Sequence, residues 1–254
     1  MRHWIGLVRA ELAKLRRLVV FRAVAWSLLL GPGAVVLALR LVASDISTVV
    51  GSPGEVVLGS VVLLAAFGGI VLAASLLGSE FDQGTARMLL SRGAPRFSLL
   101  SAKVVVALVA VTAAGGVASL AGTGEVILAG WQPTAGQAAE VVGKTLALVP
   151  LVSLVYIGFT ALGAIVGRST AAGMLAGLLL FLGDFLLATL RTPIPLGEWL
   201  PVANLFALLG GTFAFVLPPG TVPTASGAAQ RLALFGVATV VSAAYIFQRQ
   251  DVHQ

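Results

Sequence analysis

The hydrophobic positions of this chain fall into six long apolar runs, separated by short stretches rich in glycine, proline and serine. An α-helix rises about 1.5 Å per residue, so about 20 apolar residues cross the roughly 30 Å hydrocarbon core of a bilayer. The runs have about this length. They predict an all-α, polytopic membrane protein with a single transmembrane domain over residues 1–254. About six transmembrane helices are expected, near residues 22–43, 56–78, 99–121, 141–166, 171–190 and 231–248.

The first 18 residues follow a different pattern, with apolar positions at helical spacing on one side and basic residues around them. Trp4, Val8, Leu12 and Leu15 belong to the apolar stripe. A basic amphipathic helix of this kind lies in the plane of the membrane interface, where anionic lipid attracts each basic residue by roughly 1 kcal/mol. We expect an in-plane helix over residues 1–18; a helix exposed to solvent is the alternative.

The segment from 191 to 230 is too long for a simple hairpin between two spans. Pro193, Pro195 and Pro201 interrupt it early, and Trp199 suits the membrane interface. The apolar run at 205–217 is short of the length of a span. An outer loop with short interfacial or re-entrant helices is therefore expected.

The amino-acid composition also indicates a protein that is surrounded by lipid. Of the 254 residues, 58% are hydrophobic and 10% are charged, whereas soluble domains are about 45–50% apolar and about 25% charged. The mean hydropathy is +1.03. The chain has no cysteine, which excludes disulfides, thiolate nucleophiles and cysteine zinc sites.

The basic residues indicate the orientation, because cytoplasmic loops retain Lys and Arg. With the N-terminus inside, six spans put both termini in the cytoplasm, and twelve of the sixteen basic residues lie on that side. The other side holds Arg40, Lys144, Arg191 and Arg231. The net charge of +6 is thus explained by topology, and no nucleic-acid partner is needed. The predicted location is the cell membrane, as in a bacterial inner membrane.

The cytoplasmic stretch between the second and third spans, residues 79–98, is the most informative one. Ser79 followed by Asp82 is typical of a capping box, so a short helix is expected to begin at Ser79 and end near Gly93 and Pro95. An apolar Phe81 between Glu80 and Asp82 is typical of a docking element. An ordinary positive-inside loop would explain the arginines here, but it has no use for two carboxylates.

This stretch resembles the signature of the permease subunits of type 2 ABC transporters (the ABC-2 type permease family). The residues that carry the resemblance are Glu80, Gly84-Thr85, Leu89-Leu90-Ser91-Arg92, Arg96 and Lys103. The order of parts, an in-plane helix followed by six spans, is similar as well. The resemblance thus covers nearly the whole chain.

The resemblance implies a non-catalytic transmembrane subunit that docks a separate cytoplasmic ATPase through a coupling helix. The ATPase would bind ATP and Mg²⁺, and no cofactor is expected in this chain. A second permease copy or a related chain would complete the transporter, and membrane lipid would surround it. Export of a hydrophobic or amphipathic compound, such as an antibiotic, drug or lipid, is the implied activity. The residues expected to dock the ATPase are Glu80, Phe81, Asp82, Gly84, Thr85, Arg87, Met88 and Arg92.

Motifs for catalysis within the chain are weak. Gly143-Lys144-Thr145 lacks the first glycine of a P-loop, because Ala138 stands there. The two histidines, His3 and His253, lie at the two ends of the chain. No metal site is predicted, and the energy for transport must come from an ATPase partner or from an ion gradient.

Asp184 is the ionisable residue that stands out in the spans, because charge in the hydrocarbon core is costly and typically functional. A transport-path or subunit-interface role and a helix–helix hydrogen bond are both open. Asp184 could also relay protons in an ion-coupled secondary transporter, which is the competing function; a non-transporting scaffold or sensor is a third. The pairs Gly163/Gly167 and Gly173/Gly177 predict close helix packing.

Overall fold

The computed structural model describes residues 2–42, 52–85, 95–128, 130–189, 199–210 and 224–249. Most residues in these ranges are helical, and no strand occurs in them. Among the described residues, six helices are long and apolar enough to cross a membrane, as the apolar runs predict. The all-α fold class is therefore confirmed.

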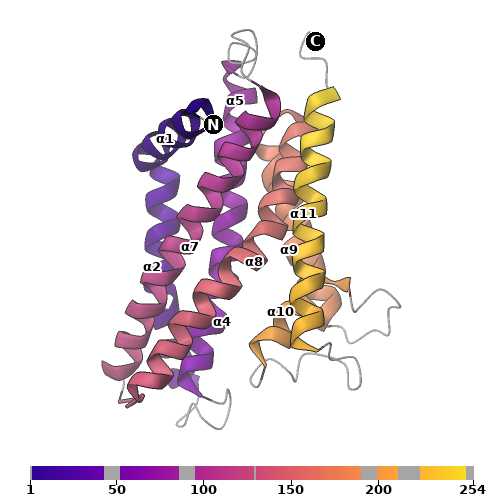
Figure 1. The fold of residues 1–254 in the computed structure, drawn as a ribbon. Helices are drawn as coiled ribbons and strands as arrows, with labels where there is room; N and C mark the ends of the chain where they lie inside the picture. Colours follow the sequence, from indigo (N-terminus) through magenta and orange to yellow (C-terminus); the bar gives the residue numbers. More distant parts are fainter. Residues whose placement is uncertain are drawn as a thin grey trace.

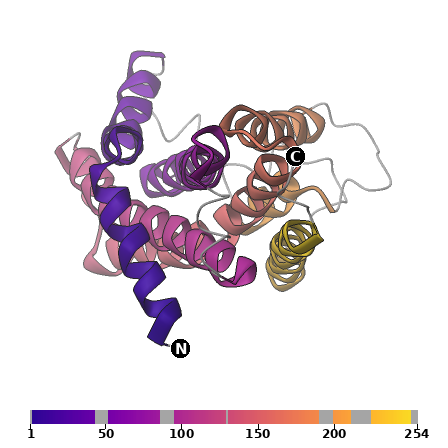
Figure 2. The same ribbon diagram turned by 90° about the horizontal axis from the view of Figure 1, so that it is seen from above.

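The chain begins with α1 (Arg2–Arg17), which lies across the ends of α2 and α7 (Figures 1 and 2). The spanning helices are α2 (Val19–Val42), α4 (Pro53–Ala73) with its extension to Asp82, α7 (Arg96–Leu128), α8 (Ala135–Gly167), α9 (Thr170–Thr189) and α11 (Ala225–Arg249). A short helix, α10 (Pro201–Leu209), precedes α11. Figure 1 shows α1, α5 and the C-terminal end of α11 at one end of the molecule and α10 at the other.

Two helices form the centre of the bundle. The α4 helix contacts α2, α7, α8 and α9, and α8 contacts α4, α7, α9 and α11. In the span that contains α4, 78% of the most apolar window is buried within the protein, compared with 17% in α9. Since an apolar helix that is buried on every side must lie among other helices, α4 occupies the interior.

Small residues let α8 and α9 approach closely. A Cβ atom at Gly163 would overlap Ala176, and one at Gly177 would overlap Thr160. The close packing predicted from the glycine pairs is confirmed here. The turn between the two helices is tight, because only Arg168 and Ser169 separate them, and Arg168 ends α8 in the left-handed conformation with φ 50°.

The short helix α10 agrees with the expected short helices of the outer segment. Most of its residues are buried, and it packs against α11, α9 and α8. The helix begins four residues before the apolar run at 205–217, with Pro201 in its first turn. Residues 211–217 of that run lie outside the described residues.

Candidate functional site

The helix that carries the sequence signature continues from α4 without a break. After α4, residues Ala74–Gly78 form a π-helical turn, η1, and α5 (Ser79–Asp82) follows directly. The prediction of a capping box at Ser79 is wrong, because the Ser79 hydroxyl donates to the carbonyl of Ser75 in the preceding turn. Short π-helical turns inside α-helices are frequent at functional sites, and this one places Glu80 on the inside of the molecule.

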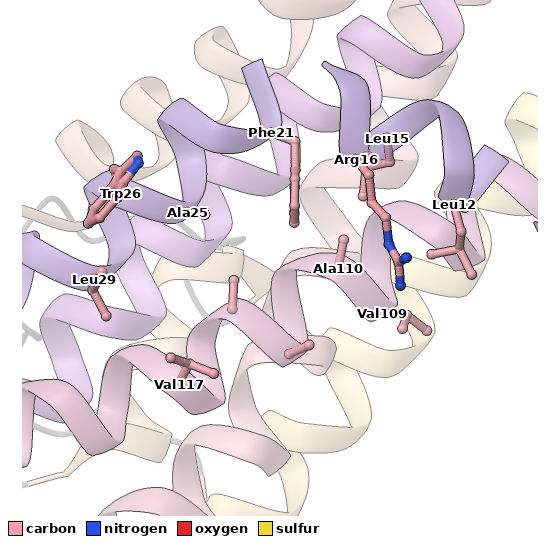
Figure 3. A pocket seen from close by; sticks show the side chains of 12 residues that line it. Leu12, Leu15, Arg16, Phe21, Ala25, Trp26, Leu29, Val109, Ala110 and Val117 are labelled. Atoms are coloured by element: carbon pink, nitrogen blue, oxygen red, sulfur yellow. The ribbon is translucent and has the colours of Figure 1, made fainter. Parts of the chain in front are cut away.

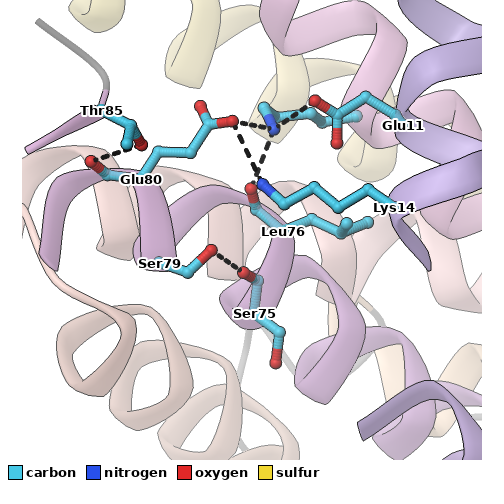
Figure 4. Close-up of polar contacts among 8 residues, drawn as sticks. Glu11, Lys14, Ser75, Leu76, Ser79, Glu80 and Thr85 are labelled. Atoms are coloured by element: carbon cyan, nitrogen blue, oxygen red, sulfur yellow. Dashed lines mark hydrogen bonds and ion pairs between the residues drawn. The ribbon is translucent and has the colours of Figure 1, made fainter. Parts of the chain in front are cut away.

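A buried cluster of charges forms around Lys103 of α7. The Lys103 ammonium lies 2.6 Å from Glu80 Oε1 and 2.8 Å from Glu11 Oε1, and it donates to the Leu76 carbonyl at 3.0 Å. Lys14 of α1 lies 3.5 Å from Glu80 on the outer side of the cluster (Figure 4). The Lys103 side chain is 1% exposed, so its charge depends on these partners.

This cluster joins three separate segments of the chain: α1 through Glu11 and Lys14, the η1/α5 turn through Leu76 and Glu80, and α7 through Lys103. A second bond between α1 and α7 runs from the Trp4 indole N–H to the Ser101 hydroxyl, at 3.1 Å. The cavity beside Glu80 and Lys103 has a volume of only about 10 Å³, at the lower limit for one water molecule. The cluster therefore has no room for a ligand and serves to connect helices.

Asp82 connects α5 to α9. Its two carboxylate oxygens accept from the Thr170 backbone N–H at 3.2 and 3.4 Å, at the first residue of α9. Carboxylates stabilise helix N-termini, where N–H groups lack partners inside the helix. The backbones are also in close approach, since a Cβ atom at Gly78 would overlap the Thr170 backbone.

Phe81 connects the same turn to α11. Its ring meets Phe247 edge to face, with 6.3 Å between centroids and an angle of 82°. Nearby, Arg96 at the start of α7 donates to the carbonyls of Phe247 and Gln248 at 3.1 and 2.9 Å. These contacts satisfy carbonyls at the C-terminal end of α11, which have no partner within the helix.

The remaining residues predicted for docking divide into two groups. Gly84 is exposed in the left-handed conformation, with φ 67°, and Thr85 donates to the Glu80 carbonyl at 3.4 Å. Arg87, Met88 and Arg92 lie outside the described residues. The structure thus brings Glu80, Phe81 and Asp82 into contact with four other helices and leaves Gln83 and Gly84 on the surface.

Asp184 lies far from this cluster along the chain, and it is buried between α8, α9 and α10. Its Oδ2 accepts from the Val202 backbone N–H at 2.8 Å and from the Tyr156 hydroxyl at 3.4 Å. Val202 is the second residue of α10. The carboxylate thus bonds to the N-terminus of the short helix. This is a hydrogen bond between helices, one of the two roles that the sequence left open for Asp184.

Sequence reasoning missed Glu11, Lys14 and Tyr156. Glu11 is the sole acidic residue in a helix with several basic ones, which was a usable signal for a specific partner. Its pairing with Lys103 joins positions 92 residues apart, and no local pattern encodes that. Glu140 and Lys144, in contrast, form an ion pair one turn apart, at 2.7 Å on an exposed face, as their spacing on a helix favours.

The chain was compared with models of known protein families. A family model described as ABC-2 family transporter protein matches residues 7–186, which extend from α1 to α9 and include the charge cluster. Among curated proteins, none is similar enough to this sequence to count as a match.

Proposed function

Because the chain belongs to the ABC-2 family of transporter proteins, we propose that it is the permease of an ATP-driven exporter and that the turn at residues 79–85 receives the motion of a cytoplasmic ATPase. The ATPase would hold ATP and Mg²⁺, and this chain would supply the transmembrane helices. Two copies of the permease, or this chain and a related one, would enclose the path. An amphipathic or hydrophobic compound is the proposed cargo, since the apolar helices offer few charges to a polar one.

The observation that carries this proposal is the set of contacts of the turn. Through Glu80, Phe81 and Asp82, one turn of helix contacts α1, α7, α11 and α9. A force applied to this turn would reach every one of those helices through short, direct contacts. A loop that merely retains positive charge has no need for such an arrangement.

The contacts also refine which residues would meet the ATPase. Glu80 is buried against Lys103, and Phe81 is packed against Phe247. We therefore assign these two residues to transmission within the permease. The docking surface would be Asp82, Gln83 and Gly84, which are exposed at the tip of the turn, together with the residues that follow in sequence.

The orientation follows from the same proposal. The end of the molecule that bears α1, α5 and the last turn of α11 would face the cytoplasm, where the ATPase and its ATP are (Figure 1). The distribution of basic residues along the sequence, with twelve of sixteen in segments predicted to be cytoplasmic, supports it.

The test uses the tagged full-length chain, purified from its own cells in mild detergent. The eluate is assayed for vanadate-sensitive ATP hydrolysis. We expect Gln83→Trp to reduce the co-purified ATPase activity at least tenfold without changing the thermal stability of the permease, because the Gln83 side chain is exposed. Gln230→Trp is the matched control, an exposed glutamine at the other end of the molecule. Equal activity in the wild type, Gln83→Trp and Gln230→Trp would contradict docking at this turn.

An ion-coupled transporter with Asp184 as proton relay is the alternative function. Asp184 Oδ2 accepts from the Val202 backbone of α10 and from the Tyr156 hydroxyl, whereas its buried Oδ1 has no hydrogen-bond partner among the described residues. In the purification above, ATP hydrolysis in the eluate and its loss in the Gln83 variant would separate the two functions.

A further inference from the structure

An apolar groove of about 490 Å³ lies between α1, α2 and α7 (Figure 3). Its volume is within the range of small-molecule sites, roughly 300–1,000 Å³. It opens to the outside of the bundle, because Trp26, Val109 and Val117 along it are more than half exposed. The lining residues are Leu12, Leu15, Arg16, Phe21, Ala25, Trp26, Leu29, Val109, Ala110, Ala113, Ala114 and Val117.

Side-chain size explains the groove. Three alanines of α7 line the groove and are called its floor below: Ala110, Ala113 and Ala114. Phe21 and Trp26 line it from α2 (Figure 3). A row of alanines next to aromatic side chains leaves a channel on the surface of the bundle. Apart from Arg16, every lining side chain is hydrophobic, so the groove suits a hydrocarbon chain and offers little to a polar ligand.

The length of the groove matches one leaflet. Phe21 and Leu29 on α2 are eight residues apart, and so are Val109 and Val117 on α7, which corresponds to about 12 Å along each helix. The hydrocarbon core is roughly 30 Å thick, so the groove covers most of one half. It begins where α2 begins, at the end of the molecule that carries α1.

A single charge stands at the mouth of this groove. Arg16 of α1 is exposed, and its side chain extends across the groove toward Val109 (Figure 3). In the part of the chain that the structure describes, no carboxylate pairs with Arg16, whereas Lys14, two residues before it, faces Glu80. A guanidinium presents a fork of donors that fits phosphate oxygens.

We propose that this groove binds one anionic phospholipid, with its phosphate on Arg16 and one acyl chain on the alanine floor of α7. Two features of this surface identify the occupant. The apolar groove, which covers most of one leaflet, fits an acyl chain, and the unpaired guanidinium at the membrane surface fits a phosphate. The proposal is independent of the ATPase and of the direction of transport. It requires only that the six helices span a bilayer.

The bound lipid would hold α1 in place. Leu12 and Leu15 of α1 form one side of the groove, and Glu11 on the same helix pairs with Lys103. An occupied groove thus keeps α1 packed against α2 and α7 and keeps its carboxylate within reach of the buried lysine. Anionic lipid is therefore expected to stabilise the cluster as well as the groove.

The test measures quenching of Trp26 by brominated lipid. The probe variant keeps Trp26 and carries phenylalanine at the other three tryptophans, Trp4, Trp131 and Trp199. The purified full-length chain in detergent is titrated with dibrominated phosphatidylglycerol or dibrominated phosphatidylcholine. Half-maximal quenching is expected at about a fivefold lower mole fraction of phosphatidylglycerol, the factor for the roughly 1 kcal/mol that one basic residue contributes at a charged membrane surface.

Two pairs of variants make the result specific. Arg16→Gln is expected to abolish the fivefold preference, while Arg9→Gln, an exposed arginine of α1 outside the groove, retains it. Ala113→Phe fills the floor and is expected to reduce quenching by both lipids, while Ala23→Phe on the exposed face of α2 leaves it unchanged. Retention of phosphatidylglycerol by the chain with all its tryptophans, measured by native mass spectrometry, repeats the comparison should the probe variant fold poorly.

Three outcomes would overturn the proposal. Equal quenching by the two lipids in the unsubstituted probe would mean ordinary contact with surrounding lipid. A preference that survives Arg16→Gln would place the anion elsewhere on the molecule. Quenching by neither lipid would mean that protein covers the groove, as it would if a second copy of the chain packed there.

Discussion

Removal of the Lys103 ammonium is the perturbation that tests the charge cluster. The Lys103→Met variant keeps the length and apolar character of the side-chain stem but leaves Glu11 and Glu80 facing each other without their cation. Both carboxylates are nearly buried, at 10% and 7% side-chain exposure, and Lys14 remains only at 3.5 Å from one of them. One Glu11 oxygen already has no hydrogen-bond partner in the described structure, so the loss has no local compensation.

The magnitude follows from the burial. Removing one partner of a buried ion pair typically destabilises a protein by about 3–5 kcal/mol, because an uncompensated charge remains inside. At about 2–4 °C per kcal/mol for a chain of this size, the midpoint of thermal unfolding is expected to fall by about 10 °C. Lys144→Met is the control: its partner Glu140 is also at hydrogen-bonding distance, but both side chains are more than half exposed, and such pairs contribute about 0–1 kcal/mol.

The assay is thermal unfolding of the purified chain in detergent at one fixed heating rate, followed by tryptophan fluorescence. Adding Glu80→Gln to Lys103→Met removes one of the two stranded carboxylates and is expected to recover part of the lost stability. If Lys103→Met and Lys144→Met lower the midpoint equally, or if the added Glu80→Gln lowers it further, the buried charge pairing does not hold these helices together.

Two further predictions concern the other end of the molecule and its orientation. Asp184→Leu removes the acceptor for the Val202 amide and is expected to speed hydrogen exchange in α10 at least tenfold, since a hydrogen bond to a charged group contributes about 1.5–3 kcal/mol. Asp184→Asn keeps an acceptor, so we expect it to keep the protection of α10 and the coupling of transport to ATP. Loss of transport in Asp184→Asn with α10 still protected would instead indicate a proton relay. Because the chain has no cysteine, a single introduced cysteine shows which side of the membrane its position faces. In intact cells, Gln83→Cys should be shielded from an impermeant thiol reagent, while Ser52→Cys and Thr224→Cys should react. Labelling of position 83 from outside would reverse the topology.

Several features of the site were within reach of the sequence because they are local. The tight approach of α8 and α9 follows from glycines four residues apart, and the pairing of Glu140 with Lys144 follows from one turn of helix. The motif around Glu80 identified the right region. The prediction that a separate, capped helix begins at Ser79 was wrong, because α4 continues through a π-helical turn and the Ser79 hydroxyl bonds back to Ser75. Whether a helix continues or starts anew depends on the packing around it.

By itself the sequence determined the fold class, the number of spanning helices and the family, because hydrophobic length and the order of the elements are properties of the chain alone. Only the tertiary structure decided what the charged residues do. Glu80 carries a signature that reads as a surface for a partner, yet it lies inside, against a lysine from another helix and beside a glutamate from a third. The reason is physical: a charge in an apolar environment must find a partner of opposite sign, and which partner is near depends on how distant helices pack, which is not encoded in local spacing.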